Sequence, residues 1–289
     1  MNETVSVIIT TYKRKMEILS RAIRTVKAQT YQEIELIVVN DYPSYKDRII
    51  EVLKDYPDVK LISHEKNQGA CASRNDGIAA ATGKYIALLD DDDEWETNKI
   101  ETQLTYLIEK NADMVYCTGR YCCPDGSEFG MDFIHDVDED PLKDLLMGNC
   151  MGGCSFPLMK KDILLSVGGF DVQMPSSQDY DLWIRIAKTG KVVFLNEPLV
   201  KYNLQNDSIS SDATKRISGY YKLLAKHRTL FRQYPGTAGN IYRNILDVAL
   251  SYRDYEESLK AMLMSFECFP ENIAVFKLLI EKVSNKVKK

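Results

Sequence analysis

An excess of basic charge is absent from this sequence. The 289 residues include 37 lysines and arginines against 42 aspartates and glutamates, which gives a formal net charge of −5 at pH 7. A protein that holds nucleic acid through its phosphates without sequence specificity needs a positive field. We therefore expect no nucleic-acid partner.

Long apolar runs are also missing. No stretch approaches the roughly 20 apolar residues that a membrane helix needs, and the first residues, Met1-Asn2-Glu3-Thr4, lack the basic and apolar regions of a secretory leader. We expect a cytoplasmic protein, with peripheral attachment to the inner face of a membrane as the alternative. With 45% hydrophobic residues, the chain has ample material for a buried core.

Nitrogen and sulfur ligands for a metal are few and poorly spaced. The three histidines, His64, His135 and His227, show no pairing and are assigned no role. The seven cysteines are odd in number and form no CxxC pair, which is typical of reduced thiols rather than of a disulfide framework. A zinc site is the less favoured alternative. Its ligands would come from Cys117, Cys122, Cys123, Cys150 and Cys154.

Strand and helix patterns alternate through the first hundred residues. Short β-branched or apolar runs predict strands, and apolar residues at helical spacing predict helices. The predicted strands cover 5–11, 34–39, 59–63 and 84–89. The predicted helices cover 16–26, 45–54, 69–81 and 98–110. This alternation predicts an α/β fold with a mainly parallel sheet, whose connections leave the C-terminal strand ends open to a ligand.

The alternation loosens in the second half. A strand is predicted at 113–118, a hairpin turn at 124–126, an antiparallel strand at 152–159, and helices at 161–167 and 176–188. Beyond residue 210 the pattern is mostly helical, with helices predicted at 220–231, 241–252, 255–266 and 273–283. We therefore expect one domain at 1–211 and a helical C-terminal region at 212–289, which serves packing, membrane docking or oligomerisation, in that order of preference.

Four consecutive aspartates, Asp90 to Asp93, follow the predicted strand at 84–89. They place dense negative charge at the C-terminal end of a buried strand, where open α/β sheets bind ligands. Oxygen ligands favour a hard divalent ion, Mg²⁺ or Mn²⁺, and such an ion favours a diphosphate. A solvated acidic turn is the usual explanation of an isolated acidic run, but the strand before this one favours a binding site.

Six short motifs follow one another along the chain. They are Thr10-Thr11-Tyr12, Asn40-Asp41, Asn67-Gln68-Gly69 with Ser73-Arg74-Asn75, Leu89 to Trp95, Gly168-Gly169-Phe170-Asp171, and Gln178-Asp179-Tyr180-Asp181-Leu182-Trp183. Their order and spacing resemble those of the family 2 glycosyltransferases of the GT-A fold. The resemblance covers the helical tail poorly. It implies an inverting enzyme that moves a sugar from a nucleotide diphosphate donor, expected to be a UDP-sugar, to a hydroxyl of a glycan or lipid-linked acceptor.

The same resemblance assigns roles to the acidic run. By its match to the family's D-x-D pattern, Asp92 is the expected metal ligand, for Mn²⁺ or Mg²⁺, and Asp90 would reach the ribose or the sugar. Asp91, counted with the donor-binding residues, and Asp93 would support them. A metal there would stabilise the charge left on the diphosphate.

The nucleotide pocket is assigned in the same way. Asp41 resembles the residue that accepts a hydrogen bond from the base, and Thr10 and Tyr12 would line that pocket. Arg74 matches a position associated with the nucleotide or its phosphates. Two simpler roles stay open: Asp41 as the start of the turn at 42–44, and Arg74 as a surface arginine of a helix.

Inversion requires direct attack by the acceptor oxygen, so a carboxylate must take the hydroxyl proton. Asp179 is the expected base, because it begins a helix whose other face is apolar and therefore rigidly held. Asp181 points about 200° around that helix and is expected only to favour the helix N-terminus. Two positions depart from the family: Gln178, often glutamate, and Gln205, frequently a histidine that helps to hold the metal.

Other classes of protein stay open. A sugar-nucleotide nucleotidyltransferase would share the sheet and the metal, but the segment 11–14 contains no glycine for a phosphate loop. A glycoside hydrolase would need two carboxylates and no nucleotide pocket. A catalytically silent module would bind the nucleotide sugar without turnover. The motifs do not specify the sugar, the acceptor or the linkage; acceptor choice is expected to lie in residues 120–160 and the tail.

Overall fold

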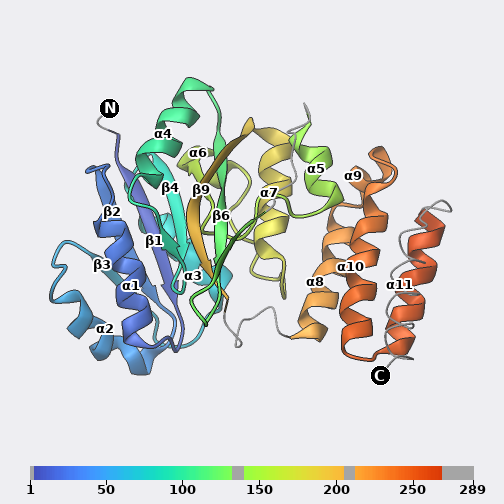
Figure 1. The fold of residues 1–289 in the computed structure, drawn as a ribbon, viewed down its shortest axis with the longest axis horizontal. Helices are drawn as coiled ribbons and strands as arrows, with labels where there is room; N and C mark the ends of the chain where they lie inside the picture. Colours follow the sequence, from blue (N-terminus) through green and yellow to red (C-terminus); the bar gives the residue numbers. More distant parts are fainter. Residues whose placement is uncertain (1–2, 132–139, 205–211, 269–289) are drawn as a thin grey trace. The chain divides into compact units, whose positions relative to one another are not determined.

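The computed structural model describes residues 3–131, 140–204 and 212–268 (Figure 1). The chain divides into two compact units. The first consists of Met1–Pro141, Met151–Val172 and Leu182–Gln205, and the second of Leu142–Cys150, Gln173–Asp181 and Asn206–Lys289. Helix α7 (Gln178–Thr189) begins in the second unit and continues in the first. The boundary expected at 211/212 stays a prediction.

The strands of the described residues form one mixed sheet of nine strands. They are β1 (Val5–Thr11), β2 (Ile34–Asn40), β3 (Lys60–Ser63), β4 (Tyr85–Asp90), β5 (Glu94–Trp95), β6 (Met114–Cys122), β7 (Glu128–Gly130), β8 (Pro157–Lys160) and β9 (Val192–Asn203). Their order is β3-β2-β1-β4-β8-β6-β9-β5, with β7 beside β6. Strands β1 to β4, β6 and β9 share one direction, and β5, β7 and β8 oppose them. The mainly parallel α/β sheet is therefore confirmed.

Helices cover both faces of this sheet, as the near-continuous apolar sequence of its central strands requires. Helices α1 (Met16–Lys27), α2 (Lys46–Leu53) and α4 (Lys99–Glu109) pack on the face that carries Val7 and Val38. Helix α3 (Ala70–Ala80) packs on the other face, where a Cβ on Gly77 would lie 2.5 Å from Ile8 Cγ2. Gly77 therefore permits α3 to approach the sheet closely.

Strand order brings the predicted ligand-binding ends together. β1 lies between β2 and β4, so the chain leaves β1 toward one side and returns to its other side. In the register, Thr10 pairs with Asp90 of β4, and Thr11 pairs with Asn40 of β2. The polar ends of β1, β2 and β4, at Thr10-Thr11, Asn40 and Asp90, are thus neighbours at the point where the strand order reverses.

The patterns do not predict several elements of the first unit. The acidic run continues into the short strand β5, which pairs with β9, and β9 itself is interrupted in its apolar pattern by Glu197 and Pro198. The register of β6 and β9 shifts at Cys117 and Thr118, next to that interruption. Such a shift breaks the alternation of apolar and polar residues on which strand prediction depends. Helix α6 (Lys161–Ser166) lies where expected.

The described part of the second unit is helical. It contains α5 (Pro141–Met147), which is not predicted, the first turn of α7, and α8 (Ala213–Lys226), α9 (Arg228–Gln233), α10 (Thr237–Ser251) and α11 (Tyr255–Cys268). The helix predicted at 220–231 is wrong in its bounds. Asp212 caps α8 by accepting a hydrogen bond from Lys215 N at 3.1 Å, and α8 ends before His227. The helix predicted at 273–283 lies outside the described residues.

Asp181 is a buried anchor of the second unit. Its side chain is 0% exposed, and Lys226 Nζ and His227 Nε2 each lie 2.9 Å from one of its oxygens. Asp181 therefore does more than favour the helix N-terminus, which is the role expected from the sequence. His227, which has no assigned role in the sequence, contacts Asp181 in the structure. None of the helices in the described ranges is long and apolar enough to cross a bilayer.

Candidate functional site

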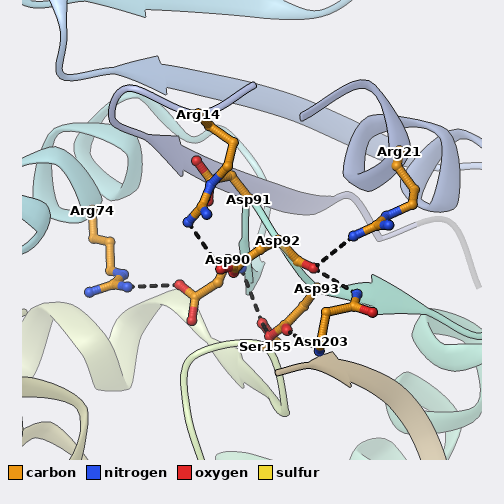
Figure 2. A network of polar contacts seen from close by, with 9 residues as sticks. All are labelled: Arg14, Arg21, Arg74, Asp90, Asp91, Asp92, Asp93, Ser155 and Asn203. Atoms are coloured by element: carbon orange, nitrogen blue, oxygen red, sulfur yellow. Dashed lines mark hydrogen bonds and ion pairs between the residues drawn. The ribbon is translucent and has the colours of Figure 1, made fainter. Parts of the chain in front are cut away.

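The acidic run forms a tight turn at the end of β4. Asp90 is the last residue of the strand, and Asp93 N donates a hydrogen bond to Asp90 O at 3.1 Å before β5 begins. The four aspartates thereby lie within one turn, where Asp90, Asp91 and Asp92 contact arginines from other elements and Asp93 contacts Ser155 and Asn203 (Figure 2). Each of the four has a different environment.

Asp91 is buried against Arg14, from the loop that joins β1 to α1. Its side chain is 7% exposed, and Oδ1 accepts a hydrogen bond from Arg14 Nε at 2.8 Å (Figure 2). Burial raises the pKa of Asp91 to about 6, although the charge of Arg14 and a hydrogen bond with Thr11 lower it. Asp91 is charged at neutral pH only at a cost in folding free energy.

Asp92 is held in a way that leaves its carboxylate partly open. Its side chain is 21% exposed, and Oδ2 lies 3.0 Å from Arg14 Nη2. Its backbone oxygen accepts hydrogen bonds from Arg21 Nη2 at 3.3 Å and from Asn203 Nδ2 at 2.7 Å (Figure 2). Burial and the charge of Asp90 raise the pKa of Asp92, and Arg14 opposes the rise. The backbone of Asp92 is thus fixed while its carboxylate can exchange partners.

Asp93 supports the turn from within the protein. It is 2% exposed, and its oxygens accept hydrogen bonds from Ser155 Oγ at 2.6 Å and from Asn203 N at 3.2 Å. Burial and the neighbouring carboxylates raise the pKa of Asp93 well above its ordinary range. Ser155 Oγ also accepts a hydrogen bond from Asp90 N at 3.1 Å. Asp93 therefore fixes the turn through Ser155.

Asp90 pairs with Arg74 of α3. Arg74 Nη2 lies 2.8 Å from Asp90 Oδ1, and Arg74 is only 8% exposed. The surface role considered for Arg74 is thus wrong. Its guanidinium lies 5.4 Å from the ring centre of Phe170, and Asn75 holds the backbone of Phe170 with two hydrogen bonds of 2.8 Å. Two motifs far apart in the sequence, 73–75 and 168–171, therefore build one wall beside Asp90.

Asp41 lies at the end of β2 and binds a loop. Its Oδ1 accepts hydrogen bonds from Gln68 N at 2.8 Å and lies 2.8 Å from His64 Nδ1, and its Oδ2 accepts from Gly69 N at 2.8 Å. The local turn is made by Asn40, whose Oδ1 accepts from Tyr42 N at 3.0 Å. Asp41 therefore anchors the loop before α3, and its role as reader of the base stays a prediction.

Thr10 and Tyr12 flank the end of β1. Thr10 is the register partner of Asp90, which places it beside the acidic turn. Tyr12 is 45% exposed, and its ring lies edge-on to Tyr42 with 5.5 Å between centres. Lys13 Nζ lies over both rings, at 5.3 and 5.0 Å from their centres. An exposed aromatic surface beside strand ends suits a planar base.

Asp179 belongs to the second unit, so its place opposite an acceptor stays a prediction. It lies in the first turn of α7, and its Oδ1 accepts a hydrogen bond from Tyr180 N at 2.8 Å. The apolar face expected of α7 is confirmed, because Leu182, Trp183 and Ile186 are all 0% exposed. Gln205 lies outside the described residues.

A divalent cation fits the chemistry of the open carboxylates. Asp90 and Asp92 keep 30% and 21% of their side chains exposed, and oxygen donors suit Mg²⁺ or Mn²⁺. Within the described ranges, no three histidine, cysteine, aspartate or glutamate side chains are grouped so as to hold a metal ion. The cysteines considered for a zinc site lie within these ranges, and they form no such group. In the described part of the chain, Asp90 is the other open carboxylate of the turn, and a diphosphate and water would add ligands to a cation at Asp92.

Sequence patterns do not identify the arginines and the polar residues that hold this turn. Arg14, Arg21, Ser155 and Asn203 each bind the acidic run, but none belongs to a motif that identified it as a partner. The position of Arg14 in the sequence is informative, since it lies two residues after Tyr12 and close to the end of β1, where a ligand is expected. The other three come from a helix, a loop and a distant strand, and only the fold brings them to the turn.

The comparisons with known proteins identify the family of this chain. Glycosyl transferase family 2 matches residues 6–164 of the chain. WfgD of Escherichia coli, a UDP-Glc:alpha-D-GlcNAc-diphosphoundecaprenol beta-1,3-glucosyltransferase, is 29% identical over 222 residues, which cover 76% of this chain and 85% of WfgD. TuaG of Bacillus subtilis, a glycosyltransferase assigned to teichuronic acid biosynthesis, is 30% identical over 219 residues, which cover 73% of this chain and 83% of TuaG.

Two solved structures share the fold. TarS of S. aureus, residues 1–349 in complex with UDP-GlcNAc, has a TM-score of 0.65 at 14% identity and covers 93% of this chain and 82% of its own. The mannosyltransferase PcManGT from Pyrobaculum calidifontis, in complex with GDP-Man and Mn²⁺, has a TM-score of 0.68 at 14% identity, and the match covers 99% of this chain and 81% of PcManGT. These likenesses confirm the GT-A architecture. With the family match over more than half of its length, the chain belongs to the family 2 glycosyltransferases.

Proposed function

We propose that this glycosyltransferase moves a sugar from a nucleoside diphosphate sugar, a UDP-sugar, to a hydroxyl of a glycan or lipid-linked acceptor, with inversion at the sugar carbon. One observation carries the proposal: Asp90 and Asp92 meet Arg14 and Arg74 at the point where the strand order reverses. Arginines and partly open carboxylates at one strand end suit a diphosphate and its divalent counter-ion.

The relatives support a role in polysaccharide or glycoconjugate biosynthesis. WfgD is named for the transfer of glucose from UDP-Glc to a GlcNAc linked to diphosphoundecaprenol, and TuaG is assigned to teichuronic acid biosynthesis. Each of the two solved relatives holds a nucleotide sugar, UDP-GlcNAc in one and GDP-Man in the other. A lipid-linked acceptor would bring the protein to the inner face of a membrane without a spanning helix. Fractionation of cells tests this location.

The nucleotide is expected at the ends of β1 and β2. Tyr12 offers an exposed ring to the base, and Thr10 lies beside the acidic turn. Asp41 already accepts two contacts at Oδ1 and one at Oδ2, so Oδ2 retains capacity for one further donor. A carboxylate only accepts, which favours a base edge with an N–H group, as uracil presents. Asp41→Ala should weaken binding of UDP, and it should also loosen the loop at 65–69.

The diphosphate is expected between the arginines and Asp92. Arg74 is held by Asp90 and Phe170, so its guanidinium is aimed before the ligand arrives. A Mg²⁺ or Mn²⁺ ion held by Asp92 would supply Lewis-acid stabilisation of the charge left on the diphosphate. Asp91 and Asp93 hold the turn and touch no ligand in this proposal.

Asp179 takes the proton of the acceptor hydroxyl in this proposal. Such a base contributes typically about 10²- to 10⁴-fold to the rate, so Asp179→Asn should cut transfer by roughly that factor and leave donor affinity nearly unchanged. Asp181→Asn is a poor control, because Asp181 is a buried anchor. Gln178→Glu is the better one, since it adds the charge that the family often has and leaves the base in place.

The first test is binding of UDP with Mn²⁺, with Mg²⁺ and with EDTA, measured by calorimetry. UDP should bind more tightly with either metal, and Asp92→Ala should lose the difference; equal affinity in every condition would contradict the metal assignment. A panel of nucleotide sugars then gives the donor through turnover, and NMR of the product gives the anomer. Retention of configuration would refute inversion, and binding without turnover across the panel would favour a silent module.

A further inference from the structure

The guanidinium of Arg14 contacts two neighbouring carboxylates at once. Its Nε lies 2.8 Å from Asp91 Oδ1, and its Nη2 lies 3.0 Å from Asp92 Oδ2. The arginine comes from the loop after β1, where the preceding residue, Lys13, has a φ of 53°. That left-handed residue turns the chain sharply at the strand end. The loop thus brings the guanidinium over the acidic turn.

The two contacts differ in how easily they can be given up. Asp91 is 7% exposed, so a lost partner there would leave a buried charge without compensation. Asp92 is 21% exposed and Arg14 is 25% exposed, so water can replace their contact. The Nε end of the guanidinium is therefore the fixed end, and the Nη2 end is the exchangeable one.

We infer that Arg14 is an internal counter-cation for Asp92, which it releases when a nucleoside diphosphate binds, so that the ligand and the divalent cation bind cooperatively. The inference rests on the proposed function. A divalent cation that arrives alone must share Asp92 with a guanidinium 3.0 Å away. A diphosphate gives Nη2 a new acceptor while Nε keeps its bond to Asp91, since arginine binds phosphate well. Asp92 is then available to the cation.

Arg21 provides a matched comparison within the same turn. It also reaches Asp92, but it binds the backbone oxygen at 3.3 Å and the side chain of Glu94 at 3.0 Å. Its charge is close to the site, yet it holds neither oxygen of the Asp92 carboxylate in the contacts of the turn. A variant of Arg21 therefore controls for the loss of a nearby positive charge alone.

The experiment measures binding of Mn²⁺ from the EPR signal of the free ion, with and without UDP, in the wild type, Arg14→Gln, Arg14→Lys and Arg21→Gln. In the wild type, UDP should tighten Mn²⁺ binding by about tenfold or more, within the range typical of coupled sites. Arg14→Gln should bind Mn²⁺ alone several-fold more tightly and show a smaller coupling than the wild type; part of the coupling stays, because the diphosphate itself ligates the cation. Arg14→Lys keeps the positive charge but cannot contact both carboxylates at once, so its coupling should lie between those of the wild type and Arg14→Gln. Arg21→Gln should keep the wild-type coupling.

The outcomes separate this inference from the function on which it rests. If UDP leaves Mn²⁺ binding unchanged in the wild type, both the metal-dependent nucleotide site and the inference fail. If the wild type shows coupling and Arg14→Gln shows the same coupling, only the inference fails. Equal losses in Arg14→Gln and Arg21→Gln would also overturn it, since they would indicate a general effect of charge. A melting curve confirms that each variant is folded, and Arg14→Lys preserves a cation beside Asp91.

Discussion

Replacing Asp91 by asparagine should stabilise the first unit at neutral pH. Asparagine resembles the protonated carboxyl, so the variant isolates the free energy of ionising Asp91 in its buried position. The pKa of Asp91 is raised from 3.8 to about 6. A shift of about two units corresponds to about 3 kcal/mol at 1.36 kcal/mol per unit, which is an upper value because the burial of the unfolded chain is neglected.

The pH dependence of this gain follows from proton binding. Between pH 4 and about 6, the folded protein binds more protons at Asp91 than the unfolded chain does, so the stability of the wild type falls as the pH rises through that window. Asp91→Asn removes this loss. The variant should be more stable than the wild type at pH 7.5, and the difference should shrink below pH 6 and vanish near pH 4.

Urea unfolding followed by tryptophan fluorescence gives the measurement. Both tryptophans of the chain, Trp95 and Trp183, belong to the first unit, so the signal reports that unit. Glu35→Gln is the control of opposite sign, because hydrogen bonds from Lys60, Ser6 and Thr82 overcome burial and lower the pKa of Glu35 to about 2. That variant should be less stable at pH 7.5, with a deficit that disappears as the pH falls below 4.5. A destabilised Asp91→Asn at pH 7.5, or a difference independent of pH, would refute the reasoning.

Three further variants test the packing and the buried charges. Asp181→Asn should cost about 3 kcal/mol, since it removes the buried carboxylate that Lys226 and His227 contact, and urea unfolding followed by helical circular dichroism measures it. Gly77→Ala should cost about 1–3 kcal/mol because the new methyl group meets a side chain at 2.5 Å, and a normal melting temperature would contradict that contact. Lys99→Met should raise the free energy of unfolding at pH 7, because burial against Trp95 lowers the pKa of Lys99 to about 8. This gain in stability should shrink as the pH rises from 8 to 10.5, and a gain that is constant with pH would refute this cause.

The local features of the sheet could be predicted from the sequence. The strands expected at 5–11, 34–39 and 84–89 differ by at most one residue at either end from β1, β2 and β4. Their apolar runs are continuous and end in polar residues, so both type and end are encoded in neighbouring residues. The polar ends then identify the ligand side of the sheet, because parallel strands finish at the same edge.

The pairings could not be predicted, because they join residues far apart in the chain. Arg14 and Asp91 are 77 positions apart, and Asp93 and Ser155 are 62. Nothing in the spacing of residues along one element reports such contacts. The same reason hid His64 and His227, which lie 23 and 46 positions from their aspartates. A lone histidine in a sequence has a role that only the fold discloses.

Helix bounds in the second unit failed for a related reason. Gly219 lowers the helix propensity of the segment 213–226, which favours a later start at 220. In the structure a Cβ at Gly219 would lie 2.1 Å from Ser176 Oγ, so the glycine permits a close contact within the second unit. Tertiary packing therefore outweighs the low helix propensity of glycine at this position.

Exposure alternates along the acidic run, and this alternation gives the D-x-D pattern a physical meaning. The side chains of Asp90 and Asp92 are 30% and 21% exposed, whereas Asp91 is 7% exposed and Asp93 is 2% exposed as a residue. The buried pair carries raised pKa values and holds the turn, so it opposes stability at neutral pH. The open pair faces arginines that a diphosphate can take over. Substitution of the two kinds of aspartate should therefore differ in one readout: the open ones should change the affinity for the donor and its cation, and the buried ones should not. The pH dependence of stability should change for Asp91 and Asp93, and also for Asp92, whose pKa is raised as well.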